Sequence, residues 1–230
     1  MTSTDATRRT GSRPAHTYYQ AGLDLRGRAC LVVGGGGVAL RKAGGLLEAG
    51  AAVTVVAPDC LPMPEGVTVV PRPFSDDDLA GVSLAVAASD DPALNARIAR
   101  LARERGVWVN VVDDPDAGTV ILPAVVRRGE LRIAISTGGA SPALARRLRE
   151  RLDAEFGPEY AELTALLGEL RAEWEPRAIA AGVPPAARRA AWHEVLDLPL
   201  AELLAAEDGR EAEARARDVL ERALAEPGRA

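Results

Sequence analysis

Short apolar runs alternate with helical patterns along the first half of the chain. Residues 30–33, 53–57, 67–70, 82–88 and 107–112 are apolar runs of strand length, and several of them are separated by apolar side chains at helical spacing. The run at 82–88 is apolar apart from Ser83, which is typical of a strand buried on both faces of a parallel sheet. Strands alternating with helices at this pitch predict a parallel sheet with right-handed crossovers.

The pattern changes from Thr119 onward. Apolar runs at 120–122, 123–126 and 131–135 are separated by a turn at 127–130 and not by a helix, which predicts antiparallel β-structure outside the parallel sheet. Helical patterns follow at 143–156 and 159–174 and continue to about residue 224. We therefore expect an α/β fold with a Rossmann-like parallel sheet domain, a small β-containing segment and a C-terminal helical domain.

Boundaries between these parts follow from the same pattern. Residues 1–17 are polar and lack periodicity, so they predict a disordered tail. Residues 18–118 form the predicted sheet domain, 119–156 the β-containing segment and its helix, and 157–230 the helical domain. Within the sheet domain, residues 18–23 predict a short edge strand or a lead-in, and Ser75 is placed to cap a brief helix.

Composition narrows the class of protein. The 230 residues carry a formal net charge of -5, which argues against a general nucleic-acid binder, because such proteins present basic surfaces. No stretch approaches the roughly 18 consecutive apolar residues of a membrane span, and no apolar segment of a secretory signal follows the N-terminal arginines. Cys30 and Cys60 form neither a metal-ligand spacing nor a disulfide framework. We expect a cytoplasmic protein without nucleic-acid or membrane partners.

Four consecutive glycines stand between the first apolar run and the first helical pattern. Gly34, Gly36 and Ala39 fit the G-x-G-x-x-G/A spacing, in which the glycines make a tight turn with room for a pyrophosphate and the small third residue lets helix and strand pack closely. A turn that only reverses the chain is the alternative, but the strand and helix patterns on either side favour a dinucleotide site. Asp59 is placed to meet a ribose hydroxyl, and no arginine follows closely to take a 2′-phosphate, so the sequence favours NAD over NADP.

Polar residues collect where the predicted strands end. Asn110, Asp113 and Asp114 belong to the end of the strand at 107–112. Open α/β sheets bind their ligands at this edge, so Asp113 is a candidate catalytic base, with a turn role as an equal alternative. Asp91, Asp114 and Asp116 are interpreted as turn or capping residues, because aspartate before or near proline is ordinary turn chemistry.

The helix expected after Ser141 is rich in arginine. Ser141 followed by Pro142 predicts an N-cap and a first turn. The arginines, among them Arg146 and Arg147, form either a solvated face or a cradle for a polycarboxylate, and the preceding glycine pair at 138–139 strengthens the second alternative. His193 lies in a later helical pattern and is expected to be a partly buried packing residue. Without a histidine-rich site, any metal would be a substrate and not a tightly held cofactor.

Five segments together resemble one known family. They are VVGGGGVALRKAGGLLEAGAAVTVVAP at 32–58, LAVAASDD at 84–91, NVVDDP at 110–115, ILPAVVRRGELRIAISTGGASPALARRLRE at 121–150 and, less specifically, ARRAAWHEVL at 187–196. In this order they resemble the precorrin-2 dehydrogenase and sirohydrochlorin ferrochelatase family of sirohaem biosynthesis. The glycine motif, NVVDDP and ISTGGASP in combination are far more specific than any one of them.

The resemblance implies an NAD-dependent oxidation of precorrin-2 to sirohydrochlorin and, in many members, insertion of Fe(II) as a substrate to give sirohaem. It also implies a homodimer that exchanges the middle segment, which makes residues 119–156 a dimerisation and substrate segment. No second large α/β module follows within these residues, so we expect precorrin-2 to be made by another protein.

The resemblance also implies roles for individual residues. The family's catalytic aspartate falls on Asp113, and its regulatory or substrate-proximal serine falls on Thr137. Its nucleotide contacts fall on Gly37 and Val38 after the turn, and on Pro58 and Asp59 after the second strand. The assigned substrate contacts are Asn110, Thr137, Ser141, Arg146 and Arg147, with Arg127 and Arg128 as weaker candidates.

Two alternatives stay open. The chain could be a dehydrogenase without chelatase activity, which the sequence does not separate from the bifunctional enzyme. It could also be a regulatory module that senses NAD and catalyses nothing. A sensor needs the glycine turn but has no use for NVVDDP together with ISTGGASP, so the sequence favours an enzyme.

Overall fold

The computed structural model describes residues 18–225 of the chain. The described residues divide into two compact units, the first made of the residues up to 122 together with 136–141, and the second of residues 123–135 and those from 142 onward. The predicted tail at 1–17 lies outside the described residues.

Five parallel strands form the sheet of the first unit within the described residues, in the order β3-β2-β1-β4-β5. The order reverses at β1, because β2 and β3 lie on one side of it and β4 and β5 on the other. This confirms the expected Rossmann-like sheet and places a topological switch point at the carboxyl ends of β1 and β4. The strands are β1 (Ala29–Val33), β2 (Ala52–Val56), β3 (Thr68–Val70), β4 (Leu84–Ala87) and β5 (Trp108–Val111).

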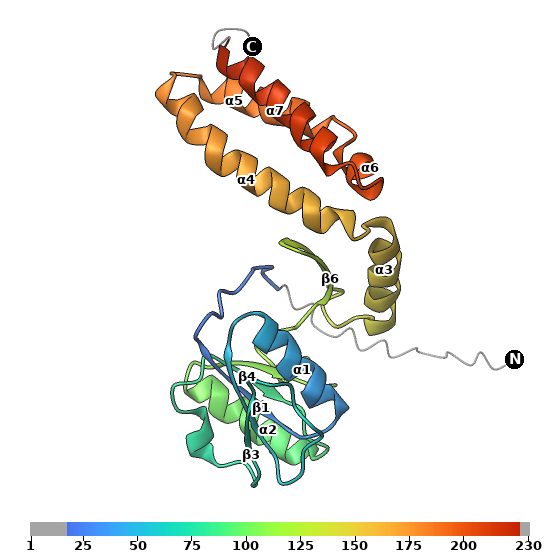
Figure 1. Cartoon of the computed structure of the whole chain (residues 1–230). Helices are drawn as coiled ribbons and strands as arrows, with labels where there is room; N and C mark the ends of the chain where they lie inside the picture. Colours follow the sequence, from blue (N-terminus) through green and yellow to red (C-terminus); the bar gives the residue numbers. More distant parts are fainter. Residues whose placement is uncertain (1–17, 226–230) are drawn as a thin grey trace, which may run out of the picture. The chain divides into compact units, whose positions relative to one another are not determined.

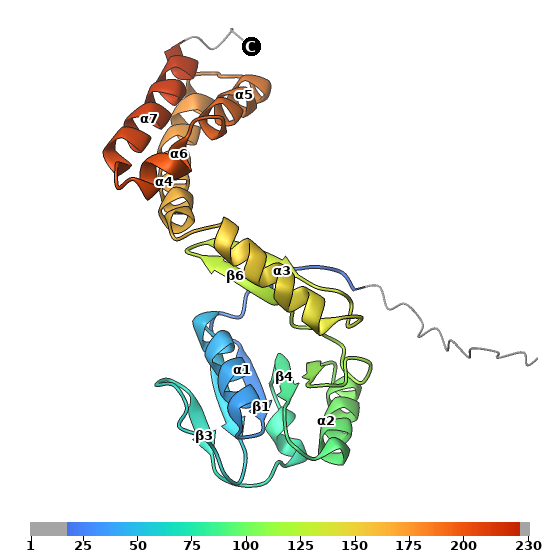
Figure 2. The same cartoon turned by 90° about the vertical axis from the view of Figure 1, so that its right-hand side faces the viewer.

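Each face of the sheet is covered by one helix. Ala39 and Ala43 of α1 (Gly37–Glu48) pack on the face that carries Val32. Ile98 of α2 (Pro92–Glu104) packs on the opposite face, which carries Leu31. Figure 2 shows β4 between α1 and α2. The strands are apolar on both faces because both faces are buried.

Local capping in the first unit follows the predicted residues. The N-cap of α2 is Asp91, whose Oδ1 accepts hydrogen bonds from the backbone N–H groups of Ala93 at 2.8 Å and Leu94 at 3.2 Å. Ser75 precedes the short 3-10 helix η1 (Asp76–Leu79), and its backbone N–H donates to Asp78 Oδ2 at 2.8 Å. Residues 18–23 form no strand, so the lead-in alternative is correct and the edge strand is wrong.

The second unit begins with an antiparallel hairpin. It is formed by β6 (Ala124–Arg128) and β7 (Leu131–Ile135), which confirms the predicted antiparallel β-structure. The helix α3 (Pro142–Glu155) packs on the hairpin and runs alongside β6 in Figure 2. Val126 lies opposite Ile133 in the register, and cross-strand partners share a face. Arg128 follows Val126 by two residues along the same strand, so it lies on this face as well.

Four further helices pack around a separate apolar core in the described residues, coloured from orange to red in Figure 1. They are α4 (Glu159–Ala180), α5 (Pro185–Leu196), α6 (Leu200–Ala205) and α7 (Gly209–Ala225). Trp174 is 2% exposed at the centre of this core. Its indole Nε1–H donates to the backbone carbonyl of Leu220 at 2.8 Å, which joins α4 to α7.

The longest helix contains a proline that the sequence pattern did not accommodate. α4 runs to Ala180, beyond the expected end at residue 174, and includes Pro176. Proline removes the hydrogen bond to the carbonyl four residues earlier, here that of Ala172. Ala172 and Pro176 are both exposed, so water can satisfy that carbonyl. Buried Trp174 and Ala178 meanwhile keep the helix packed on the core.

None of the helices within residues 18–225 has the length and apolar character needed to cross a membrane. The cytoplasmic location stays a prediction.

Candidate functional site

A crevice of about 500 Å³ opens at the switch point of the sheet. Segments that follow β1, β4 and β5 meet around it, and these three strands are neighbours at the point where the strand order reverses. This is the place where open α/β sheets bind ligands. The crevice is lined by Gly36, Gly37, Val38, Ala88, Ser89, Asp90, Pro92, Asn95, Ala96, Val111, Val112, Asp113 and Asp114.

The first two glycines of the turn are required by packing against the protein itself. Gly34 has φ +128°, and a Cβ placed on it would lie 2.2 Å from the carbonyl oxygen of Ala88. A Cβ on Gly35 would lie 1.8 Å from the carbonyl oxygen of Asp59. These glycines let β1 approach the segments after β2 and β4, and their role is therefore structural.

The next two glycines face open space. A Cβ on Gly36 or on Gly37 would meet no atom within 4 Å, and both residues are exposed. Gly36 is the N-cap of α1, no side-chain hydrogen bond caps this helix, and its first turn holds no acidic residue. The helix N-terminus therefore presents backbone N–H groups and a positive dipole end to the crevice, which suits a phosphate group. Ala39, the small third residue of the motif, is fully buried against the sheet.

The segment after β2 carries the predicted ribose contact. Pro58 and Asp59 are both exposed, and the Asp59 carbonyl packs beside Gly35, which places this segment next to the glycine turn. The next arginine along the chain is Arg72, which donates to both carboxylate oxygens of Asp78. That hydrogen-bonded guanidinium lowers the pKa of the Asp78 carboxyl. Arg72 is thus already engaged, and the arrangement fits a dinucleotide without a 2′-phosphate.

Asp113 lies at the rim of the crevice in an unusual backbone conformation. Its φ is +63°, in the left-handed region that non-glycine residues seldom occupy, although aspartate and asparagine do so more readily than most. The turn is held on both sides, since the Val112 N–H donates to the Ala87 carbonyl at 2.9 Å and Asp114 Oδ1 accepts from the Ala117 N–H at 3.2 Å. The turn thus holds the exposed Asp113 at the crevice, while Asp114 has the turn role that the sequence predicted.

Asn95 is a site residue that sequence reasoning missed. It is 8% exposed, and its amide clamps the segment after β4. Asn95 Oδ1 accepts from the Ser89 hydroxyl at 2.8 Å and from the Ser89 N–H at 3.2 Å, and Asn95 Nδ2 donates to the Ser89 carbonyl at 2.9 Å. Only its position inside α2, four residues after the N-cap Asp91, could have indicated it, because a buried polar residue on an otherwise apolar helix face needs a partner.

Three predicted substrate residues have local partners of their own. Asn110 is 9% exposed, and its Nδ2 donates to the Val120 carbonyl at 3.0 Å. Asn110 does not line the crevice. Its amide ties β5 to the segment that follows this strand. The Thr137 hydroxyl accepts from the Ser141 N–H at 3.0 Å, and between them Gly138 and Gly139 both have positive φ. Thr137 therefore shapes the loop at 136–141 of the first unit.

The predicted arginines belong to the second unit. Arg146 and Arg147 are exposed on α3, as a solvated face would be. Arg128 has a structural contact, because its guanidinium donates to the Asp153 carbonyl at 2.8 Å and pairs with the Asp153 carboxylate at 3.1 Å. This pair fastens the hairpin to α3.

Within residues 18–225, no group of three or more His, Cys, Asp or Glu side chains is placed to hold a metal ion.

Two protein families match consecutive parts of the chain. Residues 21–124 match a family described as "Putative NAD(P)-binding", which covers the sheet and the glycine turn. Residues 128–155 match one described as "Sirohaem biosynthesis protein central", which covers most of the hairpin and α3.

Curated relatives are similar over most of the chain. A siroheme synthase of Azotobacter vinelandii is 43% identical over 197 residues, which are 83% of this chain and 41% of that protein. A siroheme synthase of Thioalkalivibrio sulfidiphilus is 39% identical over 214 residues, 90% of this chain and 42% of that protein. The chain thus spans about two fifths of the length of these relatives.

A solved structure matches over nearly its whole length. The structure titled "SirC, precorrin-2 dehydrogenase" has a TM-score of 0.66 and 30% sequence identity to this chain, and the match covers 90% of this chain and 98% of SirC.

Proposed function

Because the chain belongs to the precorrin-2 dehydrogenase and sirohydrochlorin ferrochelatase family of sirohaem biosynthesis, we propose that it oxidises precorrin-2 to sirohydrochlorin with NAD. The observation that carries the proposal is the crevice at the switch point. One cavity is lined by the open glycines Gly36 and Gly37 and by Asp113. This arrangement supports a dinucleotide site and a general base that lie side by side.

The oxidation removes a hydride and a proton from the macrocycle. Bound NAD would supply the hydride acceptor, and the chain would supply a base for the proton. Asp113 is our candidate for the base, because it is an exposed carboxylate on the crevice wall held by a constrained turn. A general base acts within hydrogen-bond reach of the proton that it removes, so the position of Asp113 fits the role.

Backbone groups and small side chains would hold the dinucleotide. The N–H groups at the start of α1, from Gly37 and Val38, would bind the pyrophosphate at the positive end of the helix. Asp59 after β2 would accept a hydrogen bond from the ribose. Its carboxylate would repel a 2′-phosphate, and Arg72 is paired elsewhere, so NAD is the proposed cofactor over NADP.

The carboxylates of the tetrapyrrole would need cationic or hydrogen-bonding partners. Arg146 and Arg147 stay our candidates, because guanidinium groups pair bidentately with carboxylates. The hydroxyls of Thr137 and Ser141, beside two glycines with positive φ, are further candidates.

Iron insertion is the finer part of the proposal. Fe(II) would enter as a substrate and be bound by the nitrogens of the macrocycle, with Asp113 accepting the protons that these nitrogens lose.

We further propose a homodimer, which is supported by exposed leucines on α3: Leu144 is 49% exposed and Leu148 is 37% exposed.

The test is an anaerobic assay of the purified chain with precorrin-2 and NAD, comparing the wild type with Asp113→Asn. Asparagine tolerates the left-handed backbone of this position and removes only the charge. We expect NADH formation to fall by at least about a hundredfold, which is the usual contribution of a general base, with an unchanged unfolding transition. Addition of Fe(II) after the oxidation then tests whether the protein accelerates metal insertion.

Asp77→Asn is the matched control, since Asp77 is an exposed aspartate of the same unit outside the crevice lining. It should oxidise precorrin-2 at the wild-type rate. Oxidation without accelerated insertion would restrict the chain to the dehydrogenase step. A folded wild type that binds NAD but forms no NADH would contradict the proposal and leave the sensor alternative.

A further inference from the structure

A second cavity lies in the helical part of the second unit. It has a volume of about 370 Å³ and lies between α4 and α5. The α5 residues that line it recur three or four positions apart and so occupy one face of that helix, while Ala187, Ala191 and Val195 on another face are buried in the core. We call the cavity the arginine groove; it is lined by Arg171, Glu175, Pro185, Arg188, Arg189, Trp192, His193 and Leu196.

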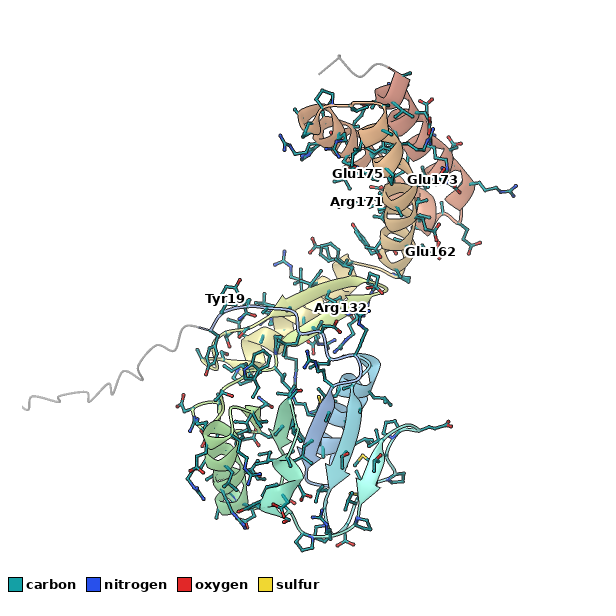
Figure 3. All side chains as sticks on the ribbon, turned by 90° about the vertical axis from the view of Figure 1, so that its left-hand side faces the viewer. Tyr19, Arg132, Glu162, Arg171, Glu173 and Glu175 are labelled. Carbon is teal, nitrogen blue, oxygen red and sulfur yellow. The ribbon has the colours of Figure 1, made fainter. Side chains whose placement is uncertain are left out.

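The charge of the arginine groove is opposite to that of the chain. Three arginines and a single carboxylate line it, whereas the whole chain has a formal net charge of -5. The carboxylate of Glu175 pairs with Arg188. Figure 3 shows Arg171 and Glu175 on one side of α4 and Glu173, which pairs with Arg217 of α7 at 2.8 Å, on the other. A positive excess is thus left in the groove.

Two buried donors in the lining have no acceptor within the described residues. They are Nε of Arg188 and Nε1 of Trp192. The neighbouring Trp174 shows the usual situation, because its indole N–H donates to the Leu220 carbonyl at 2.8 Å. The two indoles pack edge to face with ring centroids 6.0 Å apart, yet only one of them has its donor satisfied. Buried donors without partners are costly and rare in folded proteins.

His193 adds to the polar wall of the groove. The sequence pattern predicted a partly buried packing residue, but the side chain is exposed and lines the cavity. It faces away from the core because α5 buries alanines and a valine on the face that contacts α4 and α7. Pro185, Trp192 and Leu196 supply apolar surface between the polar groups.

We propose that the arginine groove binds an organic anion with at least two carboxylates. Arg171 and Arg189, which are exposed and outside the ion pairs of the described residues, would each hold a carboxylate through a bidentate pair. The apolar part of the ligand would lie against Trp192. The ligand is a free small polycarboxylic acid or the carboxylate edge of a tetrapyrrole, which present the same chemistry. The proposal does not depend on the reaction in the crevice, because the groove is formed by the helical unit alone.

The test measures binding to the full chain by calorimetry with citrate, with uroporphyrin III as a stable octacarboxylate, and with sulfate. In parallel, ¹H–¹⁵N spectra follow the indole signals of the three tryptophans, with Trp192→Phe used to assign the one in the groove. We expect citrate, uroporphyrin III or both to bind and to shift the Trp192 signal while the Trp174 signal stays in place. Citrate alone would identify a free acid as the ligand, and uroporphyrin III alone would identify the macrocycle edge.

Arg171→Gln and Arg189→Gln should each weaken this binding about tenfold, as expected for the loss of a charge-assisted hydrogen bond. Arg210→Gln is the matched control, because Arg210 is an exposed arginine of α7 outside the groove lining. The proposal is overturned if neither carboxylate ligand binds at millimolar concentration, if sulfate binds as tightly as they do, or if the two groove variants bind like the wild type.

Discussion

The crevice of the first unit and the arginine groove of the second are built by different means. Backbone forms the crevice: glycines that permit close approach, an uncapped helix end and a left-handed turn. Side chains on two helices form the groove, which has three arginines, one glutamate and a tryptophan with an unpaired donor. A site built from backbone requires particular residues at fixed spacing, whereas a site built from side chains needs only helix periodicity and charge.

The largest change in stability should appear when a packed glycine of the turn and an open one are each substituted by alanine. Gly34→Ala brings a Cβ to 2.2 Å from the Ala88 carbonyl at a φ of +128°, so we expect a loss of about 4 kcal/mol in the free energy of unfolding, or failure to fold. Gly36→Ala meets no protein atom within 4 Å and should fold normally, but bind NAD about tenfold more weakly. Urea unfolding and calorimetric NAD titration measure the two effects. A folded Gly36→Ala variant with wild-type NAD affinity would show that the open half does not bind the cofactor.

A smaller difference in stability should distinguish substitutions at the two tryptophans of the helical unit. Trp174→Phe removes a 2.8 Å hydrogen bond and opens a void in a site that is 2% exposed, so we expect a loss of about 2 kcal/mol. Trp192→Phe removes a donor without a partner and should change stability by less than about 0.5 kcal/mol. Chemical denaturation of both variants checks the difference. Equal losses would mean that the Trp192 donor is satisfied in solution, which would weaken the case for the groove.

The smallest effect concerns the cap of α2, beside the crevice. Asp91→Ala removes the acceptor for two backbone N–H groups and should lower the free energy of unfolding by about 1 kcal/mol. Asp91→Asn keeps an oxygen acceptor and is the control, with an expected change of a few tenths of a kcal/mol. Thermal unfolding followed by circular dichroism resolves the two. A loss as large in Asp91→Asn as in Asp91→Ala would assign the effect to charge and not to capping.

Much of the fold could be predicted from the sequence, because periodicity and glycine chemistry act locally. The apolar run at 82–88 becomes the buried strand β4, and Asp91 caps α2 as expected. The spacing of Gly34, Gly36 and Ala39 anticipates a turn, an open helix start and a buried helix contact. In each of these cases the residue type itself is the physical requirement.

Contacts between residues far apart in sequence are what the sequence pattern does not predict. Asn110 donates to the Val120 carbonyl and Arg128 to the Asp153 carbonyl, and local pattern indicates neither partner. The substrate contacts expected of these two residues stay predictions. Asn95 was missed because its role depends on Ser89. His193 was assigned to packing because helical periodicity does not distinguish a core face from the wall of a groove. Such partners follow from tertiary structure and are not determined by local pattern.

Both units are built from segments that are discontinuous in the sequence, and this restricts which truncations and recombination events leave a unit complete. Residues 123–135 leave the first unit, residues 136–141 return to it and residue 142 leaves it again, so neither unit is encoded by one uninterrupted stretch of sequence. A truncation at any single junction separates a unit from part of itself. Recombination between relatives would exchange a complete unit only if several crossovers occurred together, and we therefore expect the two units to have been inherited as one piece.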